Sequence, residues 1–294
     1  MPRLVSFRPG YLSHGGYNFS LGDDKEATAM QLPQNPFKRS LDGNPRYGCW
    51  AGFGTGYATE ILATTGFDWL LIDGEHAPNT VPSVLAQLQA VAPYASAPVV
   101  RTVNHDPALI KQLLDIGAQT LMIPMVDTAE QAARLVAATR YPPHGFRGVG
   151  GGLTRATRWD SVEDYLARAH EELCLVVQVE SRSGVDNAEA IAATEGVDAV
   201  FVGPVDLSTG VGHAGNPNHP DVQAMIRHTL DVTKAAGKAA GILAPAEADA
   251  KRYAEWGFDF IAVGIDISLL RQAAVETISR YKPNTPKPKS SLGY

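Results

Sequence analysis

The 294-residue sequence has little of what extracellular, membrane or nucleic-acid-binding proteins require. Its only two cysteines, Cys49 and Cys174, lie far apart in apolar runs, so we expect buried free thiols of a reducing compartment rather than a disulfide or thiolate metal site. No apolar run approaches the ~20 residues of a membrane span, and the N-terminus lacks the pattern of a secretory signal. A net charge of −6 leaves no basic surface for nucleic acid. We therefore expect a cytoplasmic protein that binds neither nucleic acid nor membrane.

An ordinary globular composition accompanies these absences, with 45% apolar and 19% charged residues. From residue 47 onward, an apolar strand, a polar or glycine-rich turn and an amphipathic helix follow one another eight times. In the helix expected at residues 81–91, for example, Val84, Leu88 and Val91 share one face. Eight such units, in a chain longer than the roughly 250 residues typical of such folds, favour a closed (β/α)8 TIM barrel over an open doubly wound sheet.

The extent of this alternation of strands and helices divides the chain into three parts. Residues 1–42 carry scattered glycines and prolines without a period, and we expect an extension rather than core: a disordered arm, a clasp on a neighbouring subunit, or an artefact of the choice of start site. Residues 43–281 form the barrel, and residues 282–294 a mobile tail. The expected strands are residues 47–53, 68–72, 98–101, 120–124, 173–180, 198–203, 239–243 and 258–264, and the expected helices are residues 57–63, 81–91, 107–115, 128–139, 162–172, 187–193, 222–236, 246–256 and 268–281.

The second expected strand changes abruptly from apolar to ionisable residues. Asp73, Glu75 and His76 follow its carboxyl end, which is where ligands bind in parallel α/β folds. A carboxylate beside an imidazole at that place could act as an acid/base pair. The structural alternative is that Asp73 caps the next turn and His76 is an ordinary loop histidine.

Three further charged residues end other strands and should share the same rim. Glu180 and Asp206 are candidates for holding a hard divalent cation, because Mg²⁺ and Mn²⁺ prefer carboxylate oxygens. The alternative for each is a helix cap. Arg101 ends an apolar run and needs an anionic partner, which is either a substrate carboxylate or enolate, or a rim carboxylate in an ion pair.

Other features of the sequence are less specific. Asp115 could orient His76 if the fold brings them together. The glycine run at residues 148–152 does not match a phosphate-binding motif, and we interpret residues 148–158, like 208–220, as rim loops that select the substrate. A Schiff-base aldolase would need a lysine at a strand's carboxyl end, and neither Lys111 nor Lys238 is expected there.

Five segments, in the same order along the chain, together resemble the metal-dependent 4-hydroxy-2-oxoheptanedioate aldolases of the HpcH/HpaI family. The resemblance runs from about Tyr47 to about Tyr281, and nothing in the family pattern corresponds to residues 1–42. The segments are FDWLLIDGEHAPN (67–79), PVVR (98–101), RYPPHGFRGVG (140–150), VQVE (177–180) and VGPVDLS (202–208).

This resemblance implies a (β/α)8 barrel of the phosphoenolpyruvate/pyruvate type, assembled as a homohexamer in which the last helix is exchanged between paired subunits. It implies reversible cleavage of 4-hydroxy-2-oxo acids, such as 4-hydroxy-2-oxoheptanedioate, to pyruvate and an aldehyde such as succinate semialdehyde. By this resemblance, Glu180 and Asp206 would be the ligands of a metal ion, which is Mg²⁺, Mn²⁺ or Co²⁺. Arg101 would stabilise the enolate, His76 would be the base, and Asp73 and Asp115 would be the acidic groups that support this base. The residues implied to contact pyruvate are Arg101, Gln178, Gly203, Val205 and Asp206.

Two other functions stay open at this point. One is a citrate-lyase-type lyase or thioesterase acting on coenzyme A esters, which would need room and basic contacts for a large nucleotide. The other is a metabolite-binding barrel without catalysis, although the ring of ionisable groups argues against it.

Overall fold

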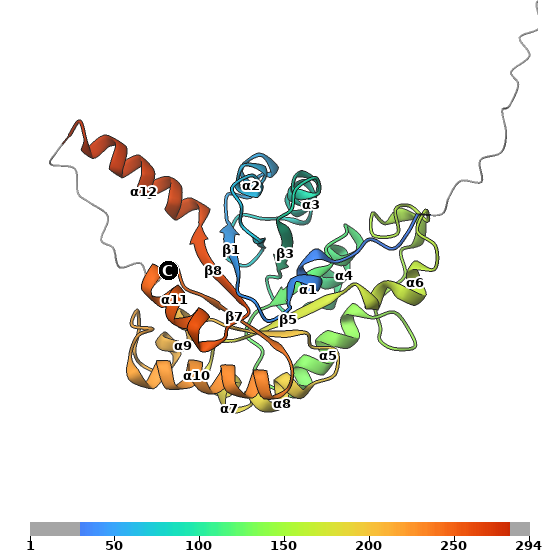
Figure 1. Cartoon of the computed structure of the whole chain (residues 1–294). Helices are drawn as coiled ribbons and strands as arrows, with labels where there is room; N and C mark the ends of the chain where they lie inside the picture. Colours follow the sequence, from blue (N-terminus) through green and yellow to red (C-terminus); the bar gives the residue numbers. More distant parts are fainter. Residues whose placement is uncertain (1–29, 283–294) are drawn as a thin grey trace, which may run out of the picture.

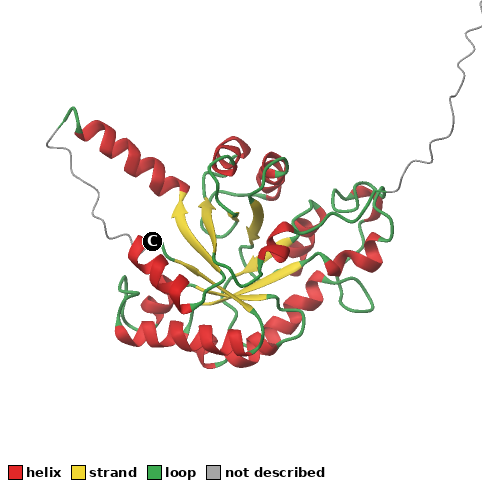
Figure 2. Cartoon of the chain, viewed as in Figure 1, coloured by secondary structure: helices red, strands yellow, loops and turns green. Residues whose placement is uncertain are grey.

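Eight strands, each parallel to its neighbours, close into a barrel in sequence order (Figures 1 and 2). The structure is a computed structural model that describes residues 30–282. The strands are β1 (Arg46–Ala51), β2 (Trp69–Asp73), β3 (Ala97–Arg101), β4 (Thr120–Ile123), β5 (Cys174–Val179), β6 (Ala199–Val202), β7 (Ala239–Leu243) and β8 (Phe260–Ile265). The predicted (β/α)8 TIM barrel is therefore confirmed.

Helices α2 to α11 lie between successive strands and cover the outside of the barrel, α1 precedes β1, and α12 follows β8. The helices are α1 (Pro36–Ser40), α2 (Gly56–Ala63), α3 (Val81–Val91), α4 (Pro107–Asp115), α5 (Ala129–Thr139), α6 (Tyr165–Arg168), α7 (Arg182–Asp186), α8 (Ala188–Ala193), α9 (Pro204–Gly210), α10 (Pro220–Ala235), α11 (Glu247–Trp256) and α12 (Asp266–Ser279), with short 3₁₀ turns at Gly151–Leu153 and Ala169–Glu171. Among the described residues, no helix is long and apolar enough to cross a membrane.

The helix expected at residues 162–172 forms only in part, as α6 followed by the 3₁₀ turn Ala169–Glu171. Asp164, directly before α6, takes a positive φ of 52°, and such left-handed backbone interrupts an α-helix.

The placement of residues 148–158 at the substrate rim is also wrong. This segment joins the end of α5 to the start of β5, and connections from a helix to the next strand lie at the amino-terminal end of the barrel. Hydrogen bonds and contacts agree with this position: Ala156 N–H donates to the carbonyl of Asp115 at 3.0 Å, at the last residue of α4. Within one chain, these residues cannot reach the carboxyl ends of the strands.

The described part of the expected extension belongs to the core, which corrects its interpretation as an appendage. Its residues 1–29 lie outside the described residues, but residues 30–42 pack on the barrel. Phe37 of α1 is fully buried, and its ring lies 5.8 Å from that of Trp69 and 5.3 Å from that of Phe260, in edge-to-face contacts. Phe37 thus helps to fill the barrel interior with aromatic side chains.

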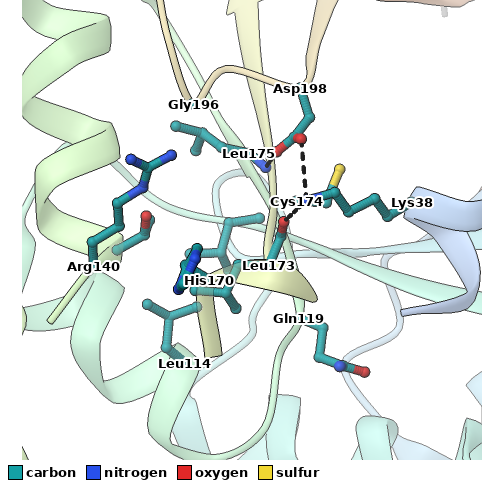
Figure 3. A pocket seen from close by; sticks show the side chains of 12 residues that line it. Lys38, Leu114, Gln119, Arg140, His170, Leu173, Cys174, Leu175, Gly196 and Asp198 are labelled. Atoms are coloured by element: carbon teal, nitrogen blue, oxygen red, sulfur yellow. Dashed lines mark hydrogen bonds and ion pairs between the residues drawn. The ribbon is translucent and has the colours of Figure 1, made fainter. Parts of the chain in front are cut away.

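A small pocket lies where α1 meets the amino-terminal ends of β5 and β6 (Figure 3). Lys38 crosses one side of it, donating to the carbonyl of Leu173 at 2.8 Å and pairing with Asp198 at 3.4 Å. These contacts tie α1 to the sheet, at the end of the barrel opposite the rim residues.

Replacing Phe37 with Ala should lower the free energy of unfolding by about 3–5 kcal/mol, because a fully buried aromatic ring leaves a cavity that the surrounding β-strands cannot fill. Urea unfolding measures this. Leu153→Ala is the matched control, since that side chain is 91% exposed and its loss should change stability by about 0.5 kcal/mol or less. A loss of less than 1 kcal/mol for Phe37→Ala would show that α1 is an appendage after all.

Candidate active site

Asp73 and Arg101 form a buried ion pair at the carboxyl ends of β2 and β3. They are the last residues of neighbouring strands and are paired in register. Arg101 Nε and Nη2 each donate to Asp73 at 2.8 Å, in a bidentate arrangement, and both residues are at most 6% exposed. Burial by itself raises the pKa of Asp73, but the hydrogen bonds and charge of Arg101 outweigh it and hold the pKa below its usual range.

Glu75 completes the surroundings of this guanidinium. Its Oε2 lies 2.9 Å from Arg101 Nη1, and the ring of Trp50 lies 5.5 Å from the guanidinium carbon. A guanidinium has five N–H donors, and these ion pairs use three of them. The rim ion pair considered from the sequence is therefore present, and two donors of a rigidly held arginine remain for the oxygens of an anionic substrate.

Glu180 follows β5 directly and is only 4% exposed. Its Oε1 accepts a hydrogen bond from Met125 N–H at 2.8 Å, and its Oε2 one from Gln178 Nε2 at 3.3 Å. Burial raises the pKa of Glu180 to about 7, and the negative charges of Asp206 and Glu75 add to this effect. Any nearby positive charge would stabilise the ionised form of this carboxyl group.

Asp206 follows β6, as expected from the sequence, and lies in the first turn of α9. Pro204 begins this helix directly after Gly203, at the end of β6. A Cβ atom at Gly203 would lie 2.3 Å from Glu180 Oε2, so only glycine lets this turn approach the carboxylate so closely. Asp206 is exposed at the barrel mouth, next to the half-buried Val205.

The oxygen atoms gathered here fit a hard divalent cation. Glu180 and Asp206 supply carboxylates, and the charge of Asp206 raises the pKa of Glu180, while Gln178 Oε1 is buried without a hydrogen-bond partner in the described part of the chain. A buried acceptor without a donor has a desolvation cost that a cation or a substrate donor would relieve. An all-oxygen donor set of this kind is typical of Mg²⁺ and Mn²⁺ sites.

His76 lies on the same rim, but its predicted supports do not contact its ring. Its side chain is 59% exposed, and Nε2 lies 3.8 Å from Glu75 Oε2. Asp73 accepts a long bond, 3.4 Å, from the backbone N–H of His76, so it supports the loop rather than the imidazole.

Asp115 is far from this rim within the same chain. It is the last residue of α4, which begins after β3 and runs back along the barrel. Its carboxylate accepts a hydrogen bond from Arg147 at 2.7 Å. A pairing of Asp115 with His76 would therefore need a second copy of the chain.

Several residues of the site were missed or given no role from the sequence. Glu75 was noticed beside Asp73 without a function, although the spacing of two residues puts both on the same face of an extended segment. Trp50 could have been found as the aromatic residue near the end of β1. Met125 acts through its backbone N–H, for which the sequence has no signal.

Replacing Asp73 with Asn should cost about 3–5 kcal/mol of stability at pH 7, because it removes one partner of a buried ion pair. The contribution of Asp73 is present above its unfolded pKa of about 3.9 and is lost as the pH falls through the lowered folded pKa. The difference from the unchanged protein, measured by urea unfolding, should therefore shrink below about pH 4.

The control for this substitution is Asp231→Asn, which breaks an exposed pair with Arg227 and should cost about 1 kcal/mol or less. A cost of Asp73→Asn that stays constant from pH 7 to acid would contradict the assigned pKa shift.

Comparison with known proteins places this site in a family. Residues 46–273 match the family model described as HpcH/HpaI aldolase/citrate lyase. A hydroxypyruvate/pyruvate aldolase of Chromohalobacter salexigens is 86% identical over 253 residues, which cover 86% of this chain and all of that protein. A 4-hydroxy-2-oxo-heptane-1,7-dioate aldolase of Salmonella paratyphi B is 54% identical, over 84% of this chain and 95% of that protein.

A solved structure agrees with these relatives. The crystal structure of an HpcH/HpaI aldolase/citrate lyase family protein from Burkholderia cenocepacia superposes with a TM-score of 0.82 at 44% identity, and covers 85% of this chain and all of that one. The family resemblance read from the sequence is thereby confirmed. The chain belongs to the HpcH/HpaI aldolase/citrate lyase family and is an aldolase, a lyase of carbon–carbon bonds.

Proposed function

We propose that this chain is a divalent-cation-dependent aldolase that reversibly cleaves 4-hydroxy-2-oxo acids to pyruvate, or hydroxypyruvate, and an aldehyde. The observation that carries the proposal is the arrangement at the barrel mouth. There, a clamped arginine with two free N–H donors lies on the same rim as the buried carboxylate of Glu180. The name of the relative at 86% identity supports pyruvate and hydroxypyruvate as the donors. Cleavage of 4-hydroxy-2-oxoheptanedioate to succinate semialdehyde is a second candidate, supported by the relative at 54%.

Glu180 and Asp206 would hold the cation, for which we propose Mg²⁺ or Mn²⁺, with Co²⁺ as a further candidate. When bound, the cation supplies positive charge that stabilises the enolate produced by bond cleavage. The raised pKa of Glu180 and the unpartnered Gln178 Oε1 are the features of the chain that favour a cation at this place.

The protein's own side chains perform the remaining steps. Arg101, oriented by Asp73 and Glu75, donates its two remaining N–H groups to the oxygens of the pyruvate moiety and stabilises the enolate charge. His76, exposed at the rim, takes the proton from the C4 hydroxyl, and the C3–C4 bond then breaks to release the aldehyde. Gln178, Gly203 and Val205 would contact the pyruvate moiety at the ends of β5 and β6.

A Schiff base is not supported by the chain. Among residues 30–282, no lysine lies at the carboxyl end of a strand: Lys111 belongs to α4, and Lys238 precedes β7.

We also propose that the enzyme works as a homo-oligomer, as a hexamer by family resemblance. Helix α12 stands away from the barrel (Figure 1) and exposes apolar side chains, among them Leu269, Leu270 and Ile278. Such a face is costly in water and suits a neighbouring subunit. Asp115 could support His76 only across such a contact, because the two lie at opposite ends of one barrel.

A substrate screen tests the proposed function. The protein, supplied with Mg²⁺ or Mn²⁺, is assayed for release of pyruvate or hydroxypyruvate from a panel of 4-hydroxy-2-oxo acids and 3,4-dihydroxy-2-oxo acids, with malyl and citramalyl coenzyme A thioesters in parallel. Turnover of the free acids supports the proposal. Turnover of the thioesters alone would make the chain a coenzyme A ester lyase, and binding of pyruvate without any turnover would make it a binding protein.

A further inference from the structure

Three potential metal ligands that the proposed reaction does not use lie together after α9: His213 and His219 in the loop between α9 and α10, and Asp221 in the first turn of α10. The two imidazole rings are stacked, with centroids 3.4 Å apart and planes inclined by 13°. One carboxylate oxygen of Asp221, Oδ2, lies 3.4 Å from His213 Nε2 and 3.6 Å from His219 Nδ1. One ligand atom from each of the three residues lies within 4.8 Å of the other two.

The separations of 3.4 Å and 3.6 Å from Asp221 Oδ2 are close to the spacing of neighbouring ligand atoms around a small tetrahedral ion. Bonds of about 2.0–2.1 Å to imidazole nitrogen and carboxylate oxygen put neighbouring ligand atoms of a tetrahedron about 3.3–3.4 Å apart. The three side chains are 28%, 32% and 67% exposed, so water can supply the fourth ligand. Two nitrogens and one oxygen favour Zn²⁺, Ni²⁺ or Cu²⁺ over Mg²⁺ and Mn²⁺, which prefer oxygen ligands.

The present contacts of the cluster are weak enough to be replaced. His219 is the N-cap of α10, and its Nδ1 accepts a hydrogen bond from Asp221 N–H at 3.2 Å, which is long for such a bond. The stacked rings are nearly parallel, so their in-plane lone pairs do not converge, and both side chains have to rotate out of the stack to direct a nitrogen to one point beside Asp221 Oδ2. The bonds from a metal ion to two imidazole nitrogens stabilise more than the long N-cap hydrogen bond of His219 and the stacking of the two rings do together.

We propose that His213, His219 and Asp221 form a second cation site, which binds Zn²⁺ or a similar late transition-metal ion. The site is separate from the oxygen-lined site of Glu180 and Asp206. It lies on the loop that leaves α9, the helix that carries Asp206, and a bound ion would fasten this loop to the first turn of α10.

The test measures Zn²⁺ binding by competition with a chromophoric chelator in the double variant Glu180→Gln, Asp206→Asn, which removes the barrel site from the measurement. The whole protein, with and without excess Mg²⁺, is measured for comparison. One equivalent of Zn²⁺ should bind to the double variant. Co²⁺ bound at the same place should show the strong visible absorption of tetrahedral coordination, which an octahedral oxygen site does not give.

Three substitutions separate ligands from structural groups. His213→Phe keeps an aromatic ring against His219, and His219→Asn keeps a side chain that caps helices well. Each should weaken Zn²⁺ binding by more than about 100-fold, since even the loss of a group behind a ligand costs 10–100-fold. His228→Asn, an exposed histidine two turns along α10, should leave binding unchanged.

The proposal fails if His213→Phe binds Zn²⁺ as the unchanged protein does, or if His228→Asn loses it equally. It also fails if Zn²⁺ binds only where Glu180 and Asp206 are intact and Mg²⁺ is absent. None of these results depends on the substrate of the enzyme, so the proposed function and the second cation site stand or fall separately.

Discussion

Replacing Glu180 with Gln should abolish tight binding of Mg²⁺ or Mn²⁺ and, with it, carbon–carbon bond cleavage. A divalent cation contributes several kcal/mol of charge stabilisation at a developing enolate. At 1.36 kcal/mol for each factor of ten, the loss in kcat/KM is on the order of 10³ or more. Asp206→Asn should act in the same direction, and a chelator should reproduce both effects in the unchanged protein, reversibly on addition of the cation.

The fold should tolerate Glu180→Gln. Glutamine keeps the oxygen that accepts the Met125 N–H bond and removes a buried carboxyl group whose pKa is raised to about 7, so a charge that burial penalises is lost. The variant should therefore be at least as stable as the unchanged protein when both lack the cation. Glu189→Gln, at an exposed position of α8, is the control for a lost surface charge.

The measurements are cation binding by calorimetry and release of pyruvate or hydroxypyruvate. Full turnover in excess chelator would disprove the cation-dependent mechanism, and an adduct trapped by borohydride would replace it with a Schiff base. Wild-type cation affinity in Glu180→Gln would show instead that the ligand assignment is wrong.

The strand ends of this barrel could be predicted from the sequence because local signals fix them. An apolar run that stops at a charged residue, as at Arg101 or Glu180, shows both the buried strand and its functional end. Parallel strands then place these residues on one rim. The sequence was therefore sufficient to place Asp73, Arg101 and Glu180 on the same face.

The predictions for residues 148–158 and for Asp115 were made from local sequence patterns. The order of strands and helices along the chain determines which end of the barrel these residues occupy, and it should have been used instead. Glycines at residues 148–152 suggested a substrate loop, but a segment between a helix and the following strand must lie at the opposite end of the barrel. The same rule separates Asp115, at the end of α4, from His76. Glycine content describes the flexibility of a segment and carries no information about which end of the barrel it occupies.

Other features of the fold and of the site depend on contacts between distant residues, which no local sequence pattern indicates. Phe37 fills the barrel from a segment that lacks any period, because one buried aromatic side chain is enough to anchor α1. The bond from Met125 N–H to Glu180 joins residues 55 positions apart. Backbone donors of this kind become visible only in three dimensions.

His76→Ala should impair aldol cleavage by roughly 10²–10⁴, the usual range for a positioned acid/base, yet spare much of the decarboxylation of oxaloacetate. Both reactions pass through the enolate of pyruvate, but only cleavage removes a proton from a C4 hydroxyl. The exposed imidazole makes no contact that stabilises the fold, so the variant should melt at an unchanged temperature.

Arg101→Lys should behave differently, because the guanidinium acts on the enolate that both reactions share. We expect kcat to fall by a factor on the order of 10²–10³ in cleavage and decarboxylation alike. Lysine keeps a positive charge between Asp73 and Glu75, which limits the cost of leaving buried carboxylates unpaired, so the circular dichroism spectrum of the variant should match that of the unchanged protein. The roles of His76 and Arg101 are assigned wrongly if His76→Ala loses decarboxylation as severely as cleavage while Arg101→Lys retains decarboxylation. In that case His76 organises the enolate site instead of moving the hydroxyl proton.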